Sequence, residues 1–179
     1  MATELGTPIE TLVVDHVVSL LGTIAAPDYP VNVTPARAFR GQKILPEHAA
    51  RGACLSVWPG IVQPDDGEEP RSFGRYYVKL PLSVGFAWEA KESEVQQRAQ
   101  LFIASIDRAL AKAGESTTGA QAFLLSLPKY PSGTPDEFTV WWKPAGAAAF
   151  VGDAMPNCVF GTVDFDLRFP RSIFRGDMA

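Results

Sequence analysis

Two carboxylates near the end of the chain, Asp164 and Asp166, are the pair best spaced for acid–base chemistry. They lie two residues apart in the segment GTVDFDLRF at 161–169, so on a strand both side chains point to the same side. A sequestered pair of this kind could act as general acid and general base. On a solvated strand face beside Arg168, the same residues are more simply a charged surface. We predict a surface role for them rather than catalysis.

The acidic residues that could bind a metal ion are crowded into one polar segment, 63–72, which reads QPDDGEEPRS. They lack the alternating spacing and the terminal glutamate of a calcium-binding loop. The sequence therefore predicts a mobile acidic loop rather than a metal site. Its four carboxylates belong to Asp65, Asp66, Glu68 and Glu69.

Histidines, cysteines and phosphate-binding motifs point to no further site. His16 and His48 have no second histidine or cysteine at ligand spacing, and we expect His16 to be solvated or at an interface and His48 to be exposed. Cys54 and Cys158 lie in apolar, strand-like segments, which predicts two buried free thiols, with a disulfide as the alternative. The motifs GxGxxG, GxxxxGK[ST] and GxSxG do not occur. We expect no enzyme, no metal and no cofactor, with a small α+β enzyme or ligand-binding module as the alternative.

The composition limits the class of protein. The chain has 179 residues, 46% of them hydrophobic, which fits a single domain over 1–179. Its net charge of −4 gives no basic field to hold duplex DNA. The N-terminal residues lack the pattern of a signal peptide, and the apolar runs are too short to cross a bilayer. We therefore expect neither nucleic acid as a lasting ligand nor a membrane as a partner.

Two amphipathic helices are predicted by apolar residues at three- and four-residue spacing. The first begins with the capping box TPIE at 7–10 and keeps its apolar stripe as far as Ile24. The second has a capping-box pattern at Ser93 and Gln96, and Gly114 ends it. Each stripe needs an apolar surface to cover.

Strands that alternate apolar and polar residues supply that surface. The predicted strands are 31–40 (an edge strand or bulge because of Pro35), 53–58, 76–88, 123–127, 137–142 and 161–169. The stretch 143–158 has little side-chain mass and is predicted to be irregular, and 171–179 is predicted to be a short tail. Helices and strands are segregated along the chain rather than alternating. This order predicts an α+β fold, a mostly antiparallel β-sheet with two main amphipathic helices packed on one face.

The adjacent tryptophans Trp141 and Trp142 must point to opposite faces of their strand, so at most one lies in the core. An exposed tryptophan more often marks a protein interface than a ligand site. Of the two, Trp142 is our candidate interface residue.

The order of these elements resembles the tail terminator (tail completion) proteins of long-tailed bacteriophages. The resemblance is carried by the long strand at 76–88, the helix AQLFIASIDRALAKAG that follows it, and the closing strand GTVDFDLRF. Arg168 and Phe169 match the basic or aromatic residues that are common in that closing strand. The acidic insert at 63–72 and the long stretch 129–156 depart from the shorter members of the family.

The resemblance implies a structural virion protein that is assembled in the host cytoplasm. Such subunits form a hexameric ring, cap the tail tube, stop its polymerisation and join it to the neck or head-completion protein, while DNA passes transiently through the lumen. A head-closure or connector protein is the alternative within this class. On this interpretation the two strand carboxylates would face the lumen, where negative charge keeps DNA from sticking. The candidate lumen or subunit-interface residues are Asp164, Asp166, Arg168, Asp65, Asp66, Glu68, Glu69 and Trp142.

Overall fold

Seven strands and three helices make up the described part of the chain. The structure is a computed structural model that describes residues 9–65, 75–114, 121–127, 136–152 and 155–172. The helices are α1 (Ile9–Leu21), α2 (Pro46–Ala49) and α3 (Val95–Gly114), with 3-10 turns η1 (Pro35–Arg37) and η2 (Glu92–Glu94). The strands are β1 (Ala38–Arg40), β2 (Cys54–Pro59), β3 (Gln63–Pro64), β4 (Arg75–Glu89), β5 (Ala122–Leu127), β6 (Asp136–Gly152) and β7 (Met155–Ser172).

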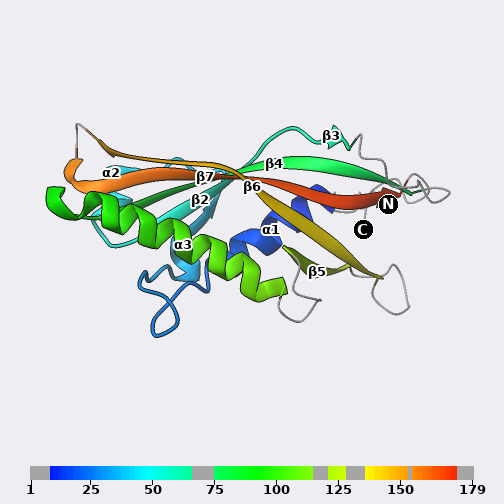
Figure 1. Cartoon of the computed structure of the whole chain (residues 1–179), viewed down its shortest axis with the longest axis horizontal. Coiled ribbons are helices and arrows are strands. Elements are labelled where there is room, and N and C mark those ends of the chain that lie inside the picture. The colour runs from blue at the N-terminus through cyan, green and yellow to red at the C-terminus, as the bar shows by residue number, and fades with distance from the viewer. Residues whose placement is uncertain (1–8, 66–74, 115–120, 128–135, 153–154, 173–179) are drawn as a thin grey trace, which may run out of the picture.

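The strands form one elongated, twisted sheet in the order β1-β2-β4-β7-β6-β5, with β3 beside β4 (Figure 1). β1 runs parallel to β2, and the other neighbouring strands are antiparallel. β4 and β7 pair over their whole common length, from Arg75 opposite Ser172 to Glu89 opposite Cys158. The predicted α+β class with a mostly antiparallel sheet is confirmed.

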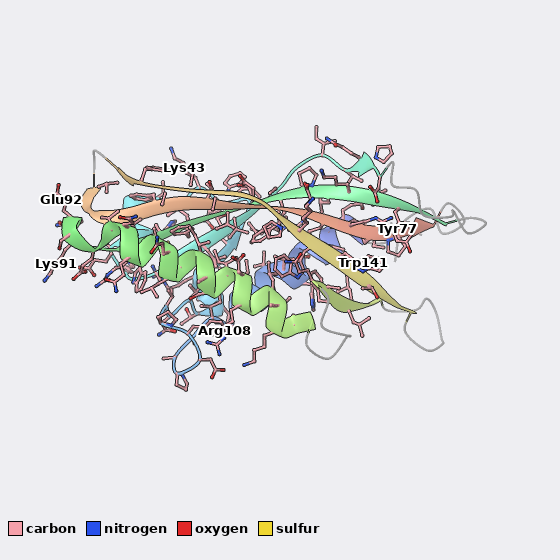
Figure 2. All side chains as sticks on the ribbon, in the orientation of Figure 1. Lys43, Tyr77, Lys91, Glu92, Arg108 and Trp141 are labelled. Carbon is pink, nitrogen blue, oxygen red and sulfur yellow. The ribbon has the colours of Figure 1, made fainter. Side chains whose placement is uncertain are left out.

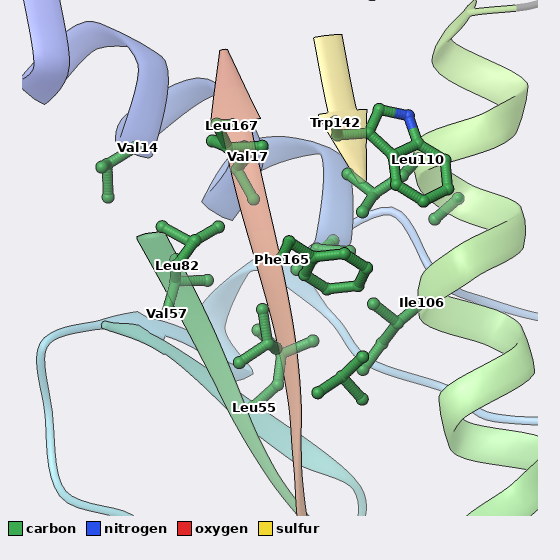
Figure 3. Packing of buried hydrophobic residues seen from close by; sticks show 14 of the residues in the cluster. Val14, Val17, Leu55, Val57, Leu82, Ile106, Leu110, Trp142, Phe165 and Leu167 are labelled. Atoms are coloured by element: carbon green, nitrogen blue, oxygen red, sulfur yellow. The ribbon is translucent and has the colours of Figure 1, made fainter. Parts of the chain in front are cut away.

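Both main helices cover the same face of this sheet, which we call the inner face. α3 packs on β5, β6 and β7, and α1 packs on β1, β2 and α3 (Figure 1). Every second residue of β4 and β7 points inward, and Figure 3 shows Phe165 of β7 beside Ile106 and Leu110 of α3. Phe165 is 1% exposed, and burying a side chain of that size contributes about 1.5–3 kcal/mol. The apolar faces of the strands, which repeat every two residues, and those of the helices, which repeat every 3.6 residues, therefore pack into one core.

The start of α3 differs from the sequence prediction. Ser93 lies inside η2 and the α-helix begins at Val95, while Gly114 ends it as predicted. The η2 turn has no side-chain cap. Instead the Arg98 guanidinium binds the Glu94 carboxylate at 3.0 Å and the Glu89 carbonyl oxygen at 2.6 Å, which ties the helix start to the end of β4. Residues 7 and 8 of the first predicted capping box lie outside the described residues.

The prediction of an irregular stretch at 143–158 is wrong, because β6 continues to Gly152 and β7 begins at Met155. Small side chains carry no alternation of hydrophobicity, but their backbone pairs with β7 all the same, for example Ala148 with Thr162. β7 also runs past the predicted 161–169 to Ser172, so it takes in the start of the predicted tail, and 173–179 lie outside the described residues.

The predicted strand at 31–40 is also much shorter in the structure. Pro35 begins the 3-10 turn η1, and β1 keeps only Ala38–Arg40, at the edge of the sheet. A proline has no N–H for the strand ladder and its fixed φ suits the first position of a helical turn, which explains the difference. The predicted strands at 76–88, 123–127 and 137–142 are confirmed within β4, β5 and β6, and the predicted strand at 53–58 is confirmed as β2 except for Ala53, which precedes it.

Candidate assembly surface

The predicted residues of the closing strand lie on the outer face of the sheet, away from α1 and α3. Asp164, Asp166 and Arg168 are half-buried and alternate with buried residues such as Phe165. Their neighbours across the sheet come from β4 on one side and β6 on the other. The outward phase of these three side chains is thus as the sequence predicts.

Arg168 contacts two aromatic rings near one end of this face. Its guanidinium carbon lies 4.4 Å from the ring centroid of Tyr77 and 5.9 Å from that of Trp141, and the two rings meet edge to face at 5.8 Å. Tyr77 and Trp141 come from β4 and β6 and lie at the same end of the sheet in Figure 2. A cation over such rings is worth about 0.5–1 kcal/mol at exposed sites. We call Tyr77, Trp141 and Arg168 the aromatic clamp.

Asp65 completes the clamp, which corrects its assignment to a mobile loop. It directly follows β3, its backbone N–H donates to the carbonyl oxygen of Tyr77 at 3.1 Å, and its carboxylate binds the Arg168 guanidinium. Asp66, Glu68 and Glu69 lie outside the described residues. Among the residues that the structure describes, no group of three or more histidine, cysteine or acidic side chains could hold a metal ion.

The remaining carboxylates differ in whether the chain itself neutralises them. Asp166 binds the Lys79 ammonium at 2.7 Å and lies opposite Lys143 in the strand register. Exposed pairs of this kind contribute about 0–1 kcal/mol and weaken in salt. Asp164 lies between Ser83 and Gly146 and, within the described residues, has no ion-pair partner. Only Asp164 of this pair therefore adds an uncompensated negative charge.

Trp142 is not a surface residue, contrary to its selection as an interface candidate. It is 5% exposed on the inner face, and its ring meets that of Phe165 edge to face at 5.7 Å (Figure 3). Trp141 is the tryptophan on the outer face. The sequence indicates the inner position of Trp142, because it alternates in phase with the apolar Phe138 and Val140 along the strand.

Both histidines are half-buried and pack against an aromatic ring, so neither is fully exposed. His16 stacks on Phe123 at 5.2 Å between ring centroids, and burial lowers its pKa. His48 accepts a hydrogen bond at Nδ1 from the N–H of Leu45 at 3.1 Å, and its ring packs on Phe39. Each has a structural partner.

The two cysteines are free and buried, as predicted. They lie in one small cluster with Ala49 of α2 and Ala87 of β4. Burial raises the pKa of both thiols, so the reactive thiolate is disfavoured. This cluster lies where α2 covers one end of the outer face.

Arg37 fixes α2 in that position. Its guanidinium donates to the carbonyl oxygens of Ala53 at 2.7 Å and Gly52 at 2.8 Å, and also to that of His48. The arginine therefore satisfies backbone acceptors at the end of α2 and the start of β2. The middle of the outer face is left uncovered by α2.

A further surface was missed because its residues were predicted to be irregular. From Lys143 to Val151, consecutive side chains of β6 are exposed, among them Phe150, at 57%, which stacks on Phe160 of β7. β5 pairs with β6 only as far as Trp141. We call the part of β6 beyond it, Lys143–Gly152, the bare arm.

The described helices include none that is long and apolar enough to span a membrane. No protein-family model and no curated protein sequence matches the chain. Among solved structures, the chain is similar to the sheath/tube terminator of an extracellular contractile injection system, PVC, in its extended state. The TM-score is 0.42 with 14% sequence identity over 94% of this chain. The chain spans 58% of the length of that terminator chain.

Proposed function

We propose that the chain is a structural terminator subunit, which caps the end of a tail tube as a ring and stops its polymerisation. The observation that carries the proposal is the arrangement of β4, α3 and β7. The long strand β4 leads through one short turn into α3, and the closing strand β7 pairs with β4 along its full length. This is the arrangement on which the resemblance to tail terminators rests.

The exposed surfaces are of the kind that such an assembly needs. A closed ring joins two different patches on neighbouring subunits, so every copy must expose both. The chain exposes the outer sheet face with its aromatic clamp, and it exposes the bare arm at a sheet edge. In this proposal the subunit acts through assembly rather than catalysis, with the tube protein and a neck protein as partners.

Asp164 is the residue that we assign to the lumen. It is half-buried on the outer face and is not neutralised by another described residue, unlike Asp166. Six copies of one uncompensated carboxylate would repel the phosphates of passing DNA. Of the two carboxylates first predicted to face the lumen, Asp164 and Asp166, this proposal keeps only Asp164.

The experiment images the purified full chain alone and after mixing with tubes polymerised from the tube protein of the same particle. We expect a six-fold ring, either free or on tube ends, and tubes that stop growing once it is bound. A chain that stays monomeric and leaves tube ends bare and growing would refute the proposal.

Charge reversal tests the lumen assignment separately. Rings of Asp164→Lys should retain duplex DNA in a mobility-shift assay, whereas Asp164→Asn, the matched neutral control, should retain much less. Equal retention of DNA by the two variants would refute the assignment of Asp164 to the lumen but would not count against the ring.

A further inference from the structure

The bare arm leaves main-chain hydrogen-bonding groups without a strand partner. On one side Lys143–Gly152 pairs with β7, from Asp166 towards Met155. On the other side β5 stops at Ala122 opposite Trp141, with one more backbone bond from the Trp142 N–H to the Gln121 carbonyl oxygen. Within the described residues, no strand lies beside the bare arm on that side. Such an edge is a template for an incoming strand.

Features that discourage such pairing lie only at the two ends of the bare arm, with Lys143 and Pro144 at one end and shifts of the β7 register at Pro144/Gly146 and Val151/Gly152. After Lys143 the bare arm reads PAGAAAFVG, which holds no charge, and Pro144 is its one residue without an N–H. Natural proteins protect exposed edges with charges, prolines, β-bulges or very short strands, and the stretch Gly146–Val151 between the two register shifts has none of these. Alanine and glycine also let a second backbone approach closely.

The opposite edge of the sheet is protected in these ways. β1 has three residues, follows the proline of η1 and ends at Arg40, whose guanidinium binds Asp15 of α1 at 2.6 Å. β3 has two residues and ends in Pro64. Among the described strands, the sheet thus has one edge protected by its own sequence and one edge without a partner.

β5 is the other described strand with an open, uncharged edge. It is the last strand in the sheet order, reads AFLLSL and exposes 40% of Leu124. Its six residues equal the length of Gly146–Val151, the stretch of the bare arm that pairs with β7 without a register shift, so one β5 edge fits along it. A contact between two different edges is heterologous, which is the type that can close into a ring.

We propose that the bare arm of one copy accepts the open edge of β5 from a second copy, so that the sheet continues from subunit to subunit. The inference rests on the proposed function, because the ring supplies the neighbouring copy. Backbone hydrogen bonds provide the binding, and the small side chains of the bare arm allow the close approach.

The first test places a charge on each edge in the full chain. Ala148→Lys on the bare arm and Leu124→Lys on β5 should each lose the oligomer in sedimentation at concentrations where the parent assembles. Ala148→Thr and Leu124→Thr are the matched controls, since threonine is neutral and favours strands, and they should keep it. Equal thermal midpoints by circular dichroism show that a variant is folded.

The second test detects the contact even where the equilibrium favours single chains. An Ala148→Cys variant and a Leu124→Cys variant, distinguished by tags of different mass, are mixed under mild oxidation. We expect a disulfide-linked pair of the two variants, because the native thiols are buried.

The results separate this contact from the ring. An oligomer that survives both lysine variants, or a mixture with no cross-linked pair, overturns the contact while the ring can still stand. Faster linking of Ala148→Cys to itself overturns β5 as the occupant, since it indicates pairing between two bare arms. Cross-linked pairs that never close into a ring support the contact and count against the terminator function.

Discussion

Gly161 of β7 has no room for even one methyl group. A Cβ built there would lie 2.3 Å and 2.6 Å from two ring carbons of Phe86 and 2.7 Å from the carbonyl oxygen of Ala148. Ordinary contacts begin near 3.4 Å, so the ring would have to retreat by about 1 Å. Phe86 is 1% exposed and stacks on Phe102 at 4.5 Å, which blocks that retreat.

Gly161→Ala should therefore destabilise the fold by about 2–3 kcal/mol, at the upper end of the cost of overpacking. For a protein of this size that corresponds to a fall in the midpoint of thermal unfolding of roughly 5–10 °C. Urea unfolding followed by tryptophan fluorescence measures the change. The matched control is Gly146→Ala, where a Cβ would meet nothing within 4 Å, and which should stay within about 0.5 kcal/mol of the parent.

A second substitution identifies the clash. Phe86→Leu alone should cost about 1–2 kcal/mol through lost packing, but it removes the two ring carbons that would meet the new methyl group. Combined with Gly161→Ala it should recover at least about 1 kcal/mol relative to the sum of the single changes. If the free-energy changes of the two substitutions are strictly additive, or if Gly161→Ala is as stable as Gly146→Ala, the steric explanation is refuted.

Three further outcomes follow from burial. Trp142→Ala should cost about 3–5 kcal/mol in urea unfolding and Trp141→Ala only about 1 kcal/mol, since the first fills the core and the second loses one face of the aromatic clamp. Asp107→Asn should raise stability at pH 7 by about 1 kcal/mol, because burial disfavours the charged carboxylate and so raises the pKa of Asp107, whose buried Oδ1 has no hydrogen-bond partner among the described residues. That gain should shrink as the pH falls and the parent's carboxyl takes up its proton. Burial lowers the pKa of His16 below 6.5, so the unfolded chain takes up the proton first and the stability falls as the pH drops below that value. The free energy of unfolding, measured from about pH 8 to about pH 5, should therefore depend less on pH in His16→Phe than in the parent.

The fold class could be predicted because its main strands have one dry and one wet face. In β7 the alternation from Val163 to Phe169 survives intact, and the outward phase of Asp164 follows from it. The bare arm could not be predicted in the same way. Its alanines and glycines carry no phase, and the pairing with β7 is decided by the rest of the sheet.

In the candidate site, too, spacing along one strand could be predicted but contacts between distant segments could not. Arg168 could be placed on the outer face from spacing, but its partners Tyr77, in β4, and Asp65, just after β3, are far away in the sequence. Ser93 matched a capping box, yet the contacts of Arg98 with the end of β4 decide where α3 begins. Tertiary contacts overrule a local pattern wherever they satisfy the same backbone groups.

The central place of β7 has a consequence for how the chain acquires its fold. β7 is the last strand in the sequence, yet it lies between β4 and β6 in the sheet. Its partners in β4 are about 70 to 100 residues away, and contacts of such separation form slowly. On the ribosome, the earlier strands remain as two separate groups until β7 emerges. A chain truncated before Met155 would therefore lack the strand that joins these two groups, and the edge of β6 that pairs with β7 would be open as well.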